Sequence, residues 1–119
     1  KEESFQLILA HSQVKVSPQK DVWQQDSIYH YKGMNICVLV DNRWRSRSVD
    51  SLLDIDYMYL CKGFKGKIAP LQKIFKIRKV ILDASLGGYR LNLLKDECRG
   101  LGLDYIDMSP KGSYRISDL

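Results

Sequence analysis

The chain has 119 residues, of which 45% are hydrophobic and 28% are charged, and its formal net charge is +5. This length fits one domain with its own core, and this composition excludes a disordered or low-complexity chain. No apolar run exceeds about five residues, whereas a membrane-spanning helix needs about 20, so no segment is expected to cross a bilayer. Because the chain begins at Lys1 without an initiating Met or a signal peptide, we interpret residues 1–119 as one domain of a longer protein.

The N-terminal quarter of the chain is predicted to hold one strand and a long loop. Apolar residues in residues 4–11 indicate a strand. Pro18 and a polar, Gln-rich composition predict a loop over residues 14–27. The isolated Trp23 is expected to fold back from this loop onto the core.

A hairpin is the strongest local signal in the chain. Two apolar runs, residues 28–32 and 35–40, flank the pair Gly33-Met34, and a Gly-X pair in this position favours a two-residue type II′ turn. A polar connection over residues 41–51 follows. Residues 56–61 then become apolar and aromatic again, which indicates another strand.

The second half of the chain alternates between helix and strand patterns. Apolar residues recur every three or four positions over residues 68–75, which predicts a short helix with Pro70 in its first turn. A second helix is predicted over residues 89–100, with Gly100 and Gly102 as its stop. Its apolar stripe consists of Leu91, Leu94, Cys98 and Leu101.

Three further strands complete the predicted fold. The continuous apolar run at residues 80–82 is typical of a strand covered on both faces, and residues 105–106 and 114–116 flank a turn at residues 109–112. The alternation of strands and helices predicts an α/β fold, a mixed sheet flanked by two main helices.

Cysteines and histidines are few in this chain. They are Cys37, Cys61, Cys98, His11 and His30. The cysteines are odd in number, form no Cys-x-x-Cys pair and lie in or beside apolar runs, so we expect buried free thiols. The histidines lie in predicted strands, and although a site that combines them with Asp41 is geometrically conceivable, their spacing does not indicate one. We therefore expect no metal and no cofactor.

Basic residues are concentrated in two segments. Between residues 57 and 82 there are seven and no acidic residue, namely Lys62, Lys65, Lys67, Lys73, Lys76, Arg78 and Lys79. Arg43, Arg45 and Arg47 form a second group with Trp44 between its members. Lysines beside glycines and arginines beside an indole suit nucleic acid or an anionic lipid surface. A solvated helix face would explain Lys73, Lys76 and Lys79 equally well. The predicted nucleic-acid-binding residues are Arg43, Arg45, Arg47, Lys62, Lys65 and Lys67.

The sequence specifies no enzyme class. Residues 63–67 lack the spacing of a P-loop and have no Ser or Thr after the Lys, and no Gly-x-Ser-x-Gly motif occurs. Cys61 would be a nucleophile only if a neighbour such as Lys62 stabilised its thiolate. Asp54, Asp56 and Asp83 lie near predicted strand ends, where they could cap turns or act in catalysis.

Several short motifs follow the order of a known family. Residues 36–41 read Ile-Cys-Val-Leu-Val-Asp where the family has Leu-Leu-x-Gly-Asp, and residues 61–64 read Cys-Lys-Gly-Phe where it has His-His-Gly-Ser. Residues 79–85 and Tyr89 match a strand and a turn that come next, and residues 91–101, 103–107 and 112–116 match its final elements. From residue 28 to its end, the chain resembles the C-terminal half of the metallo-β-lactamase-like domain of ComEC-type DNA-uptake channel proteins.

The resemblance implies a fold and a biological setting. It places the chain as a soluble C-terminal domain on the outer, periplasmic side of the inner membrane, in a protein that takes up DNA. It also makes Asp41 the counterpart of a metal-binding Asp. The other ligands differ, because Cys61 or Lys62 stands where the family has histidines, and its His-x-His-x-Asp-His motif belongs to a first half that is absent here. A dinuclear centre needs several correctly placed ligands, so catalysis is not carried over.

We therefore expect a noncatalytic domain that contacts DNA, single- or double-stranded, or the transmembrane channel portion of the same protein through its basic surface. Two alternatives remain open at this point. One is a structural or assembly module without DNA contact, and the other is a residual metal-dependent phosphodiesterase that uses Asp41. A homodimer could cover the side that half of a larger fold leaves open.

Overall fold

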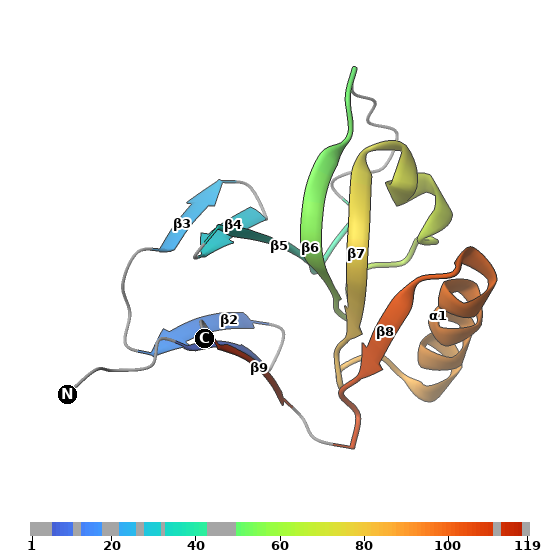
Figure 1. Ribbon diagram of the computed structural model, residues 1–119. Helices are drawn as coiled ribbons and strands as arrows, with labels where there is room; N and C mark the ends of the chain where they lie inside the picture. Colours follow the sequence, from blue (N-terminus) through green and yellow to red (C-terminus); the bar gives the residue numbers. More distant parts are fainter. Residues whose placement is uncertain are drawn as a thin grey trace.

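Figure 1 shows the fold in a computed structural model of the chain. The backbone is described for residues 6–10, 13–17, 22–25, 28–31, 33–42, 50–110 and 113–117, and the side chains for residues 28–31, 33–42 and 50–110. Within these residues, no helix is long and apolar enough to cross a bilayer.

A six-stranded mixed sheet forms the centre of the molecule. Its strands, in spatial order, are β3 (Val22–Gln25), β4 (Ile28–Tyr31), β5 (Met34–Leu39), β6 (Leu53–Leu60), β7 (Phe75–Leu82) and β8 (Asp104–Asp107). The pairs from β3 to β5 are antiparallel, and those from β5 to β8 are parallel. The predicted α/β class with a mixed sheet is confirmed.

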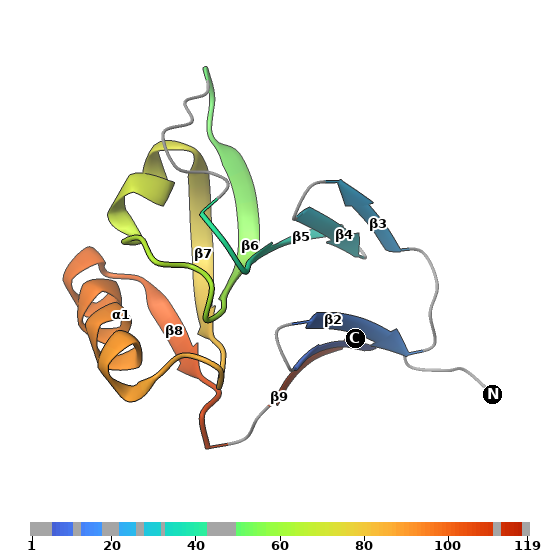
Figure 2. The ribbon, with the colours of Figure 1, turned by 180° about the vertical axis from the view of Figure 1, so that it is seen from behind.

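A smaller antiparallel sheet has the strand order β2-β1-β9, from β1 (Gln6–Ala10), β2 (Gln13–Ser17) and β9 (Ser113–Ser117). Its register aligns Leu7 with Val16 and Ile116, so apolar residues stand opposite apolar residues across the three strands. The sheet lies on one side of β6, β7 and β8, and the helix α1 (Gly88–Leu101) lies on the other side (Figures 1 and 2). The large sheet is thus the middle layer of three.

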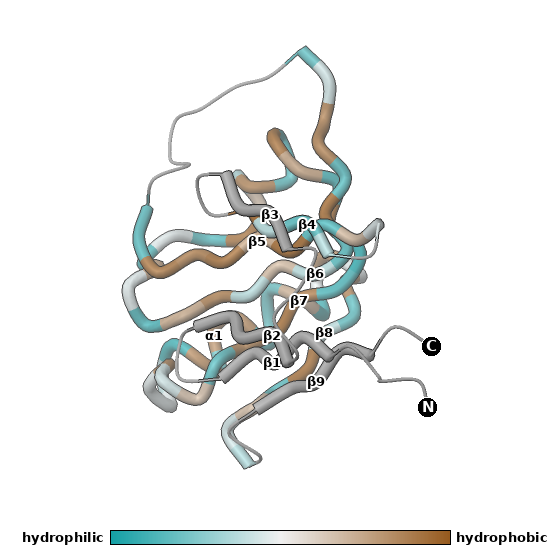
Figure 3. Tube along the Cα trace, turned by 90° about the vertical axis from the view of Figure 1, so that its left-hand side faces the viewer, coloured by the Kyte–Doolittle hydropathy of each residue, from teal (hydrophilic) through white to brown (hydrophobic). Residues whose placement is uncertain are grey.

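Both faces of the large sheet are buried. Successive side chains of a strand point to opposite faces, so its central strands carry apolar residues at consecutive positions. On β5, Cys37 and Leu39 belong to the core under α1, whereas Ile36 and Val38 belong to a second core on the opposite face. Figure 3, coloured by hydropathy, shows that β5 in the middle of the sheet is hydrophobic. The predicted stripe of α1 is confirmed in the first core, where Leu91, Leu94 and Cys98 are buried and Leu101 is partly buried.

The prediction of a loop over residues 14–27 was wrong, because this segment contains most of β2 and all of β3. Both are edge strands of their sheets. Edge strands tolerate the polar residues that made this segment resemble a loop. The side chain of Trp23, and with it the predicted contact with the core, lies outside the described residues.

The predicted hairpin is confirmed, but its turn is shifted by one residue. Tyr31 pairs with Met34, so the loop consists of residues 32 and 33 rather than Gly33-Met34. Gly33 has a φ of 78° at the second loop position, where a left-handed residue is required. A type II′ turn would place the glycine at the first position, so that assignment was wrong.

Of the two predicted helices, only α1 is an α-helix. The segment predicted as a helix over residues 68–75 forms a short 3-10 helix, η1 (Ala69–Lys73), and Phe75 already belongs to β7. Pro70 lies in the first turn of η1 and supplies no backbone donor. The helical spacing of the apolar residues arose because the end of η1 and the start of β7 bury residues on the same core.

Helix α1 ends as predicted at a glycine. Gly102 is the C-cap residue in the left-handed conformation, with a φ of 71°, whereas Gly100 lies inside the helix. Beside the core stripe, Lys95 forms a 2.6 Å ion pair with Asp107 at the end of β8. Burial acts to raise the pKa of Asp107, but hydrogen bonds from Lys95 and Ser109 outweigh it and hold this pKa below its ordinary value of 3.8.

The core role of α1 leads to a prediction for two adjacent leucines. Leu94 is buried, whereas Leu93 is 43% exposed. We expect Leu94→Ala to lower the free energy of unfolding by about 2–5 kcal/mol, and Leu93→Ala by less than about 1 kcal/mol. Urea denaturation followed by circular dichroism measures both. Equal losses would contradict the orientation of the helix.

The ion pair between Lys95 and Asp107 predicts a dependence of stability on pH. Because the pKa of Asp107 is lowered in the folded state, its carboxylate contributes fully to stability when the pH is above the ordinary pKa of 3.8. This contribution is lost as the pH falls below that value and through the lower pKa of the folded state. We expect Asp107→Asn to destabilise the domain by about 1–2 kcal/mol at pH 7, and the difference to shrink below about pH 4. Asp96→Asn, which affects the exposed pair of Asp96 with Arg99, serves as the control and should change little. A pH-independent difference would refute this role of Asp107.

Candidate functional site

Residues 61–67, which carry the predicted site residues Lys62, Lys65 and Lys67 and are called the basic loop below, begin where three parallel strands end. Cys61 N–H donates to Leu39 O at 3.0 Å, and Asp83 N–H donates to Leu60 O at 3.0 Å, so the ends of β5, β6 and β7 are aligned there. Ligands of open α/β sheets bind at such carboxyl ends. From this edge the chain crosses to the side of the sheet where α1 lies and continues to η1 (Figures 1 and 2).

Gly63 allows the basic loop to pack against the end of β5. A Cβ atom at this position would lie 1.7 Å from the carbonyl oxygen of Val40. No side chain fits at that distance, so only glycine permits this approach of two backbones. Gly63 stands at the glycine of the His-His-Gly-Ser motif in the resembling family. In this chain it has a packing role.

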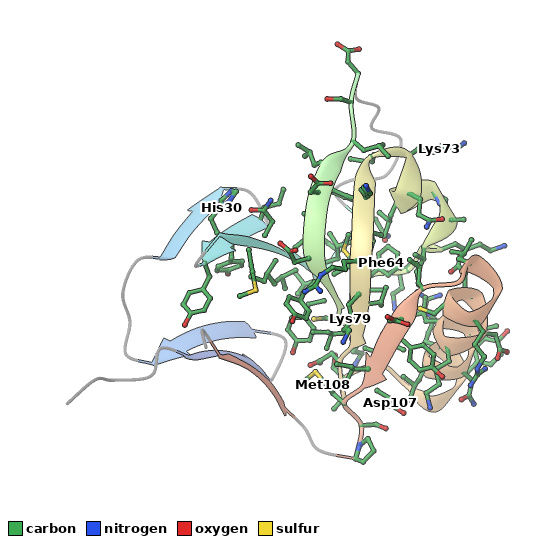
Figure 4. All side chains as sticks on the ribbon, viewed as in Figure 1. His30, Phe64, Lys73, Lys79, Asp107 and Met108 are labelled. Atoms are coloured by element: carbon green, nitrogen blue, oxygen red, sulfur yellow. The ribbon has the colours of Figure 1, made fainter. Side chains whose placement is uncertain are left out.

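Helix α1 holds the loop through Arg90. Its Nη2 donates to the carbonyl oxygens of Phe64 at 3.0 Å and Gly66 at 2.9 Å. Its guanidinium carbon lies 5.8 Å from the centroid of the Phe64 ring, a cation–π distance. The Phe64 side chain is itself buried in the core under α1 (Figure 4). Arg90 is therefore a structural cation that stabilises the loop.

Glu97 of α1 holds the other end of the same segment. Its two carboxylate oxygens accept hydrogen bonds from the amides of Ile68 at 2.7 Å and Ala69 at 2.8 Å. The 3-10 helix η1 has no side-chain cap of its own, so a residue distant in sequence satisfies the amide donors at its start. The segment from the basic loop to η1 is thus fixed on α1 at both ends.

Several backbone amides of the loop are already bonded within the protein. Lys62 N–H donates to Ser85 Oγ at 3.1 Å, Lys65 N–H donates to Asn42 Oδ1 at 2.9 Å, and Phe64 N–H donates to Cys61 O at 3.0 Å. A phosphate-cradling loop needs such amides free to point at the ligand. The capacity of this loop to bind anions therefore resides in its lysine side chains.

The cations on β7 lie beside acidic residues. Arg78 Nε is 3.6 Å from Asp56 Oδ1, and its guanidinium carbon is 5.5 Å from the centroid of the Tyr57 ring. In the strand register, Lys76 is opposite Asp54 on β6, and Lys79 is opposite Asp104 on β8. The basic residues of β7 thus have acidic neighbours whose negative charges partly offset their positive charges.

Among the described side chains, four lysines of the connection between β6 and β7 have no such acidic neighbour in an ion pair. Lys62, Lys65, Lys67 and Lys73 are exposed and form no ion pair with any residue for which side chains are described. The first three are predicted site residues, and the structure brings them together on the basic loop. Lys73 was not among the predicted site residues, because a solvated helix face explained it equally well. Its place at the end of η1, seen in Figure 4, continues the unpaired set.

Arg43, Arg45 and Arg47, the other predicted site residues, lie outside the described residues. Arg43 follows Asn42 directly in the sequence, and Asn42 is the residue whose side chain accepts the Lys65 amide. The hydrogen bond thus links the basic loop to the residue that precedes the second basic group in the sequence.

The candidate carboxylates do not come together in one place. Asp56, in the middle of β6, accepts a hydrogen bond from Asn35 N–H at 2.8 Å and so holds the start of β5. Asp83, at the end of β7, is buried and accepts hydrogen bonds from the Tyr59 hydroxyl and from Ser85 N–H. Within residues 28–31, 33–42 and 50–110, no three His, Cys, Asp or Glu side chains form a group that could hold a metal ion.

The three cysteines are buried and free, as predicted. Burial raises the pKa of the Cys98 thiol to about 11, with a smaller contribution from the charge of Glu97. Cys61 is also buried, which removes its sulfur from solvent and disfavours the nucleophilic role considered for it. His30 is exposed on β4, and His11, the other histidine of the conceivable site with Asp41, lies outside the described residues.

Comparison with known proteins identifies one family. The family model described as the ComEC C-terminal domain matches residues 1–118, nearly the whole chain. No curated protein and no solved structure shows a significant match.

The close approach at Gly63 predicts a large effect of a small substitution. Gly63→Ala should lower the free energy of unfolding by at least about 2 kcal/mol, because its Cβ would meet the Val40 carbonyl at 1.7 Å. Gly66→Ala is the matched control, since its Cβ would approach only the Phe64 ring, at 3.4 Å. Thermal unfolding of both variants tests this difference. A Gly63→Ala protein as stable as Gly66→Ala would show that the loop does not pack on β5 in this way.

Proposed function

Because this chain belongs to the ComEC C-terminal domain family, we propose that it is a noncatalytic domain of a competence DNA-uptake protein that contacts DNA through its basic loop. The observation that carries this proposal is the set of exposed, unpaired lysines on a segment that α1 holds in place. They are Lys62, Lys65, Lys67 and Lys73. Arg43, Arg45 and Arg47 extend the proposed surface in the sequence.

The fixed backbone of the loop favours an anionic polymer as the partner. Arg90 and Glu97 use their charged groups on backbone atoms, so the lysine ammonium groups are the cations of this segment that remain available to a ligand. A lysine that contacts a phosphate releases a condensed counterion, which gives favourable and salt-dependent binding. Several such lysines on one rigid segment suit the repeated phosphates of DNA better than a single small anion.

The noncatalytic part of the proposal is supported by the ligand positions. Where the resembling ComEC-type proteins have histidines, this chain has buried Cys61 and exposed Lys62. The described residues near Asp41 gather no set of metal ligands. We therefore derive no hydrolytic step for this domain. We further propose that it lies on the outer side of the inner membrane, next to the transmembrane portion of the same protein, as the resemblance implies.

DNA binding across a salt series tests the proposal. We expect labelled DNA to bind at low salt, and the logarithm of the binding constant to fall with the logarithm of salt concentration by about 0.7–0.9 per phosphate contact. Replacing Lys62, Lys65 and Lys67 together by Ala should weaken binding and reduce this slope by about 2–3. Fluorescence anisotropy provides the measurement.

The matched control replaces Lys76, Arg78 and Lys79 by Ala, which removes the same formal charge from positions beside acidic residues. This variant should keep most of the salt slope. Equal losses in both variants would indicate a nonspecific charge effect, and no binding at low salt would favour a purely structural module. The same mixtures with added Zn²⁺ or Mn²⁺ should leave the DNA intact. Degradation that Asp41→Ala abolishes would instead support a phosphodiesterase.

A further inference from the structure

Helix α1, which holds the basic loop through Arg90, carries an exposed tyrosine in its first turn. Tyr89, in the first turn of α1, is 78% exposed, the highest value among the large hydrophobic residues whose side chains are described. Leu93, one turn further along the helix, is 43% exposed. Residues four apart lie on the same face of a helix, so these two side chains form a short apolar strip. This strip contributes to neither core.

The strip lies on the helix that holds the segment with the lysines. Arg90, Leu93 and Glu97 follow the i, i+3, i+7 spacing that aligns residues along one side of a helix. Arg90 and Glu97 both bond to the backbone of residues 64–69, so Leu93 lies between two contacts with this segment. Tyr89 directly precedes Arg90 in the chain and lies one turn from Leu93. The apolar strip therefore runs along the same part of α1 that holds residues 64–69, the segment that carries Lys65 and Lys67.

The Tyr89 side chain faces solvent, since it is 78% exposed. The two positions that precede it, Gly87 and Gly88, carry no side chain that could cover the ring. An exposed aromatic ring combined with unpaired cations is the arrangement that single-strand-binding proteins use.

We propose that Tyr89, supported by Leu93, stacks on an unpaired base of single-stranded DNA while Lys65 and Lys67 contact the neighbouring phosphates. This inference rests on the proposed DNA contact and adds a base-binding position to it. Bases of a duplex are stacked on one another, so an exposed ring on a helix surface has little access to their faces. The tyrosine therefore confers a preference for single strands, whereas the lysines serve both forms of DNA.

An anionic membrane surface is the main competing partner for a surface that is both basic and apolar. An interfacial helix inserts a continuous apolar face into the bilayer. Here the exposed apolar strip has two residues, and Asp96, exposed and paired with Arg99, follows Leu93 on the next turn. A base and its two phosphates match the size of this surface better than a bilayer does.

Anisotropy titrations with single strands, the matching duplex and a single strand of abasic sites test the proposal. Tyr89→Ala should weaken binding to the single strand by about fivefold or more and binding to the duplex by less than about twofold. Tyr89→Phe should bind within about twofold of the unmodified chain, because the ring is retained. With the abasic strand, Tyr89→Ala and the unmodified chain should bind equally well.

Leu52→Ala, an exposed apolar residue ahead of β6, is the matched control and should bind DNA like the unmodified chain. An equal effect of Tyr89→Ala on single strand and duplex, or no effect on either, would overturn the stacking role and leave the DNA contact of the lysines intact. Absence of binding by the unmodified chain to either DNA would overturn both. Vesicles of anionic phospholipid provide the last comparison. Membrane binding that Tyr89→Ala abolishes, with unchanged DNA binding, would assign this surface to the membrane.

Discussion

Two charged side chains of one helix determine how the basic segment is presented. Arg90 donates to two carbonyls of the basic loop, and Glu97 accepts from two amides at the start of η1. Hydrogen bonds to charged groups are among the stronger ones in proteins, and here they join α1 to a connection whose regular structure is limited to the short 3-10 helix η1. Both side chains are used for positioning. The exposed lysines of the same segment remain the groups through which it can contact an anion.

This arrangement depends on the large sheet having both faces covered. Because α1 covers one face, the connection from β6 to β7 must pass beside the helix, where Phe64 and Ile68 join the same core. The parallel order of β5, β6 and β7 also brings three strand ends to one edge, so that Gly63 contacts the end of β5 and Ser85 bonds to the loop. The position of the candidate surface is therefore a consequence of sheet topology.

Sequence patterns predicted the elements that bury a regular stripe or a continuous apolar run. Helix α1, the hairpin of β4 and β5 and the buried cysteines were all predicted, because apolar periodicity directly reflects burial. The failures have physical causes as well. The polar edge strands β2 and β3 carry a weak apolar signal, and the apolar residues between Ile68 and Phe75 serve one core from two different elements. For the site, Lys62, Lys65 and Lys67 were predicted and Lys73 was not, and Tyr89 was matched only to a turn of the resembling family.

By itself, the sequence determined the α/β class, the basic character of the segment after β6 and the resemblance to the ComEC-type family that the family match confirms. These properties follow from composition, periodicity and motif order, all of which are local. Only the tertiary structure decided which cations have acidic neighbours, which amides are already bonded and which aromatic ring faces solvent. Those properties depend on contacts between residues about 20 to 30 positions apart, such as Arg90 with Gly66, and no local pattern encodes such pairings.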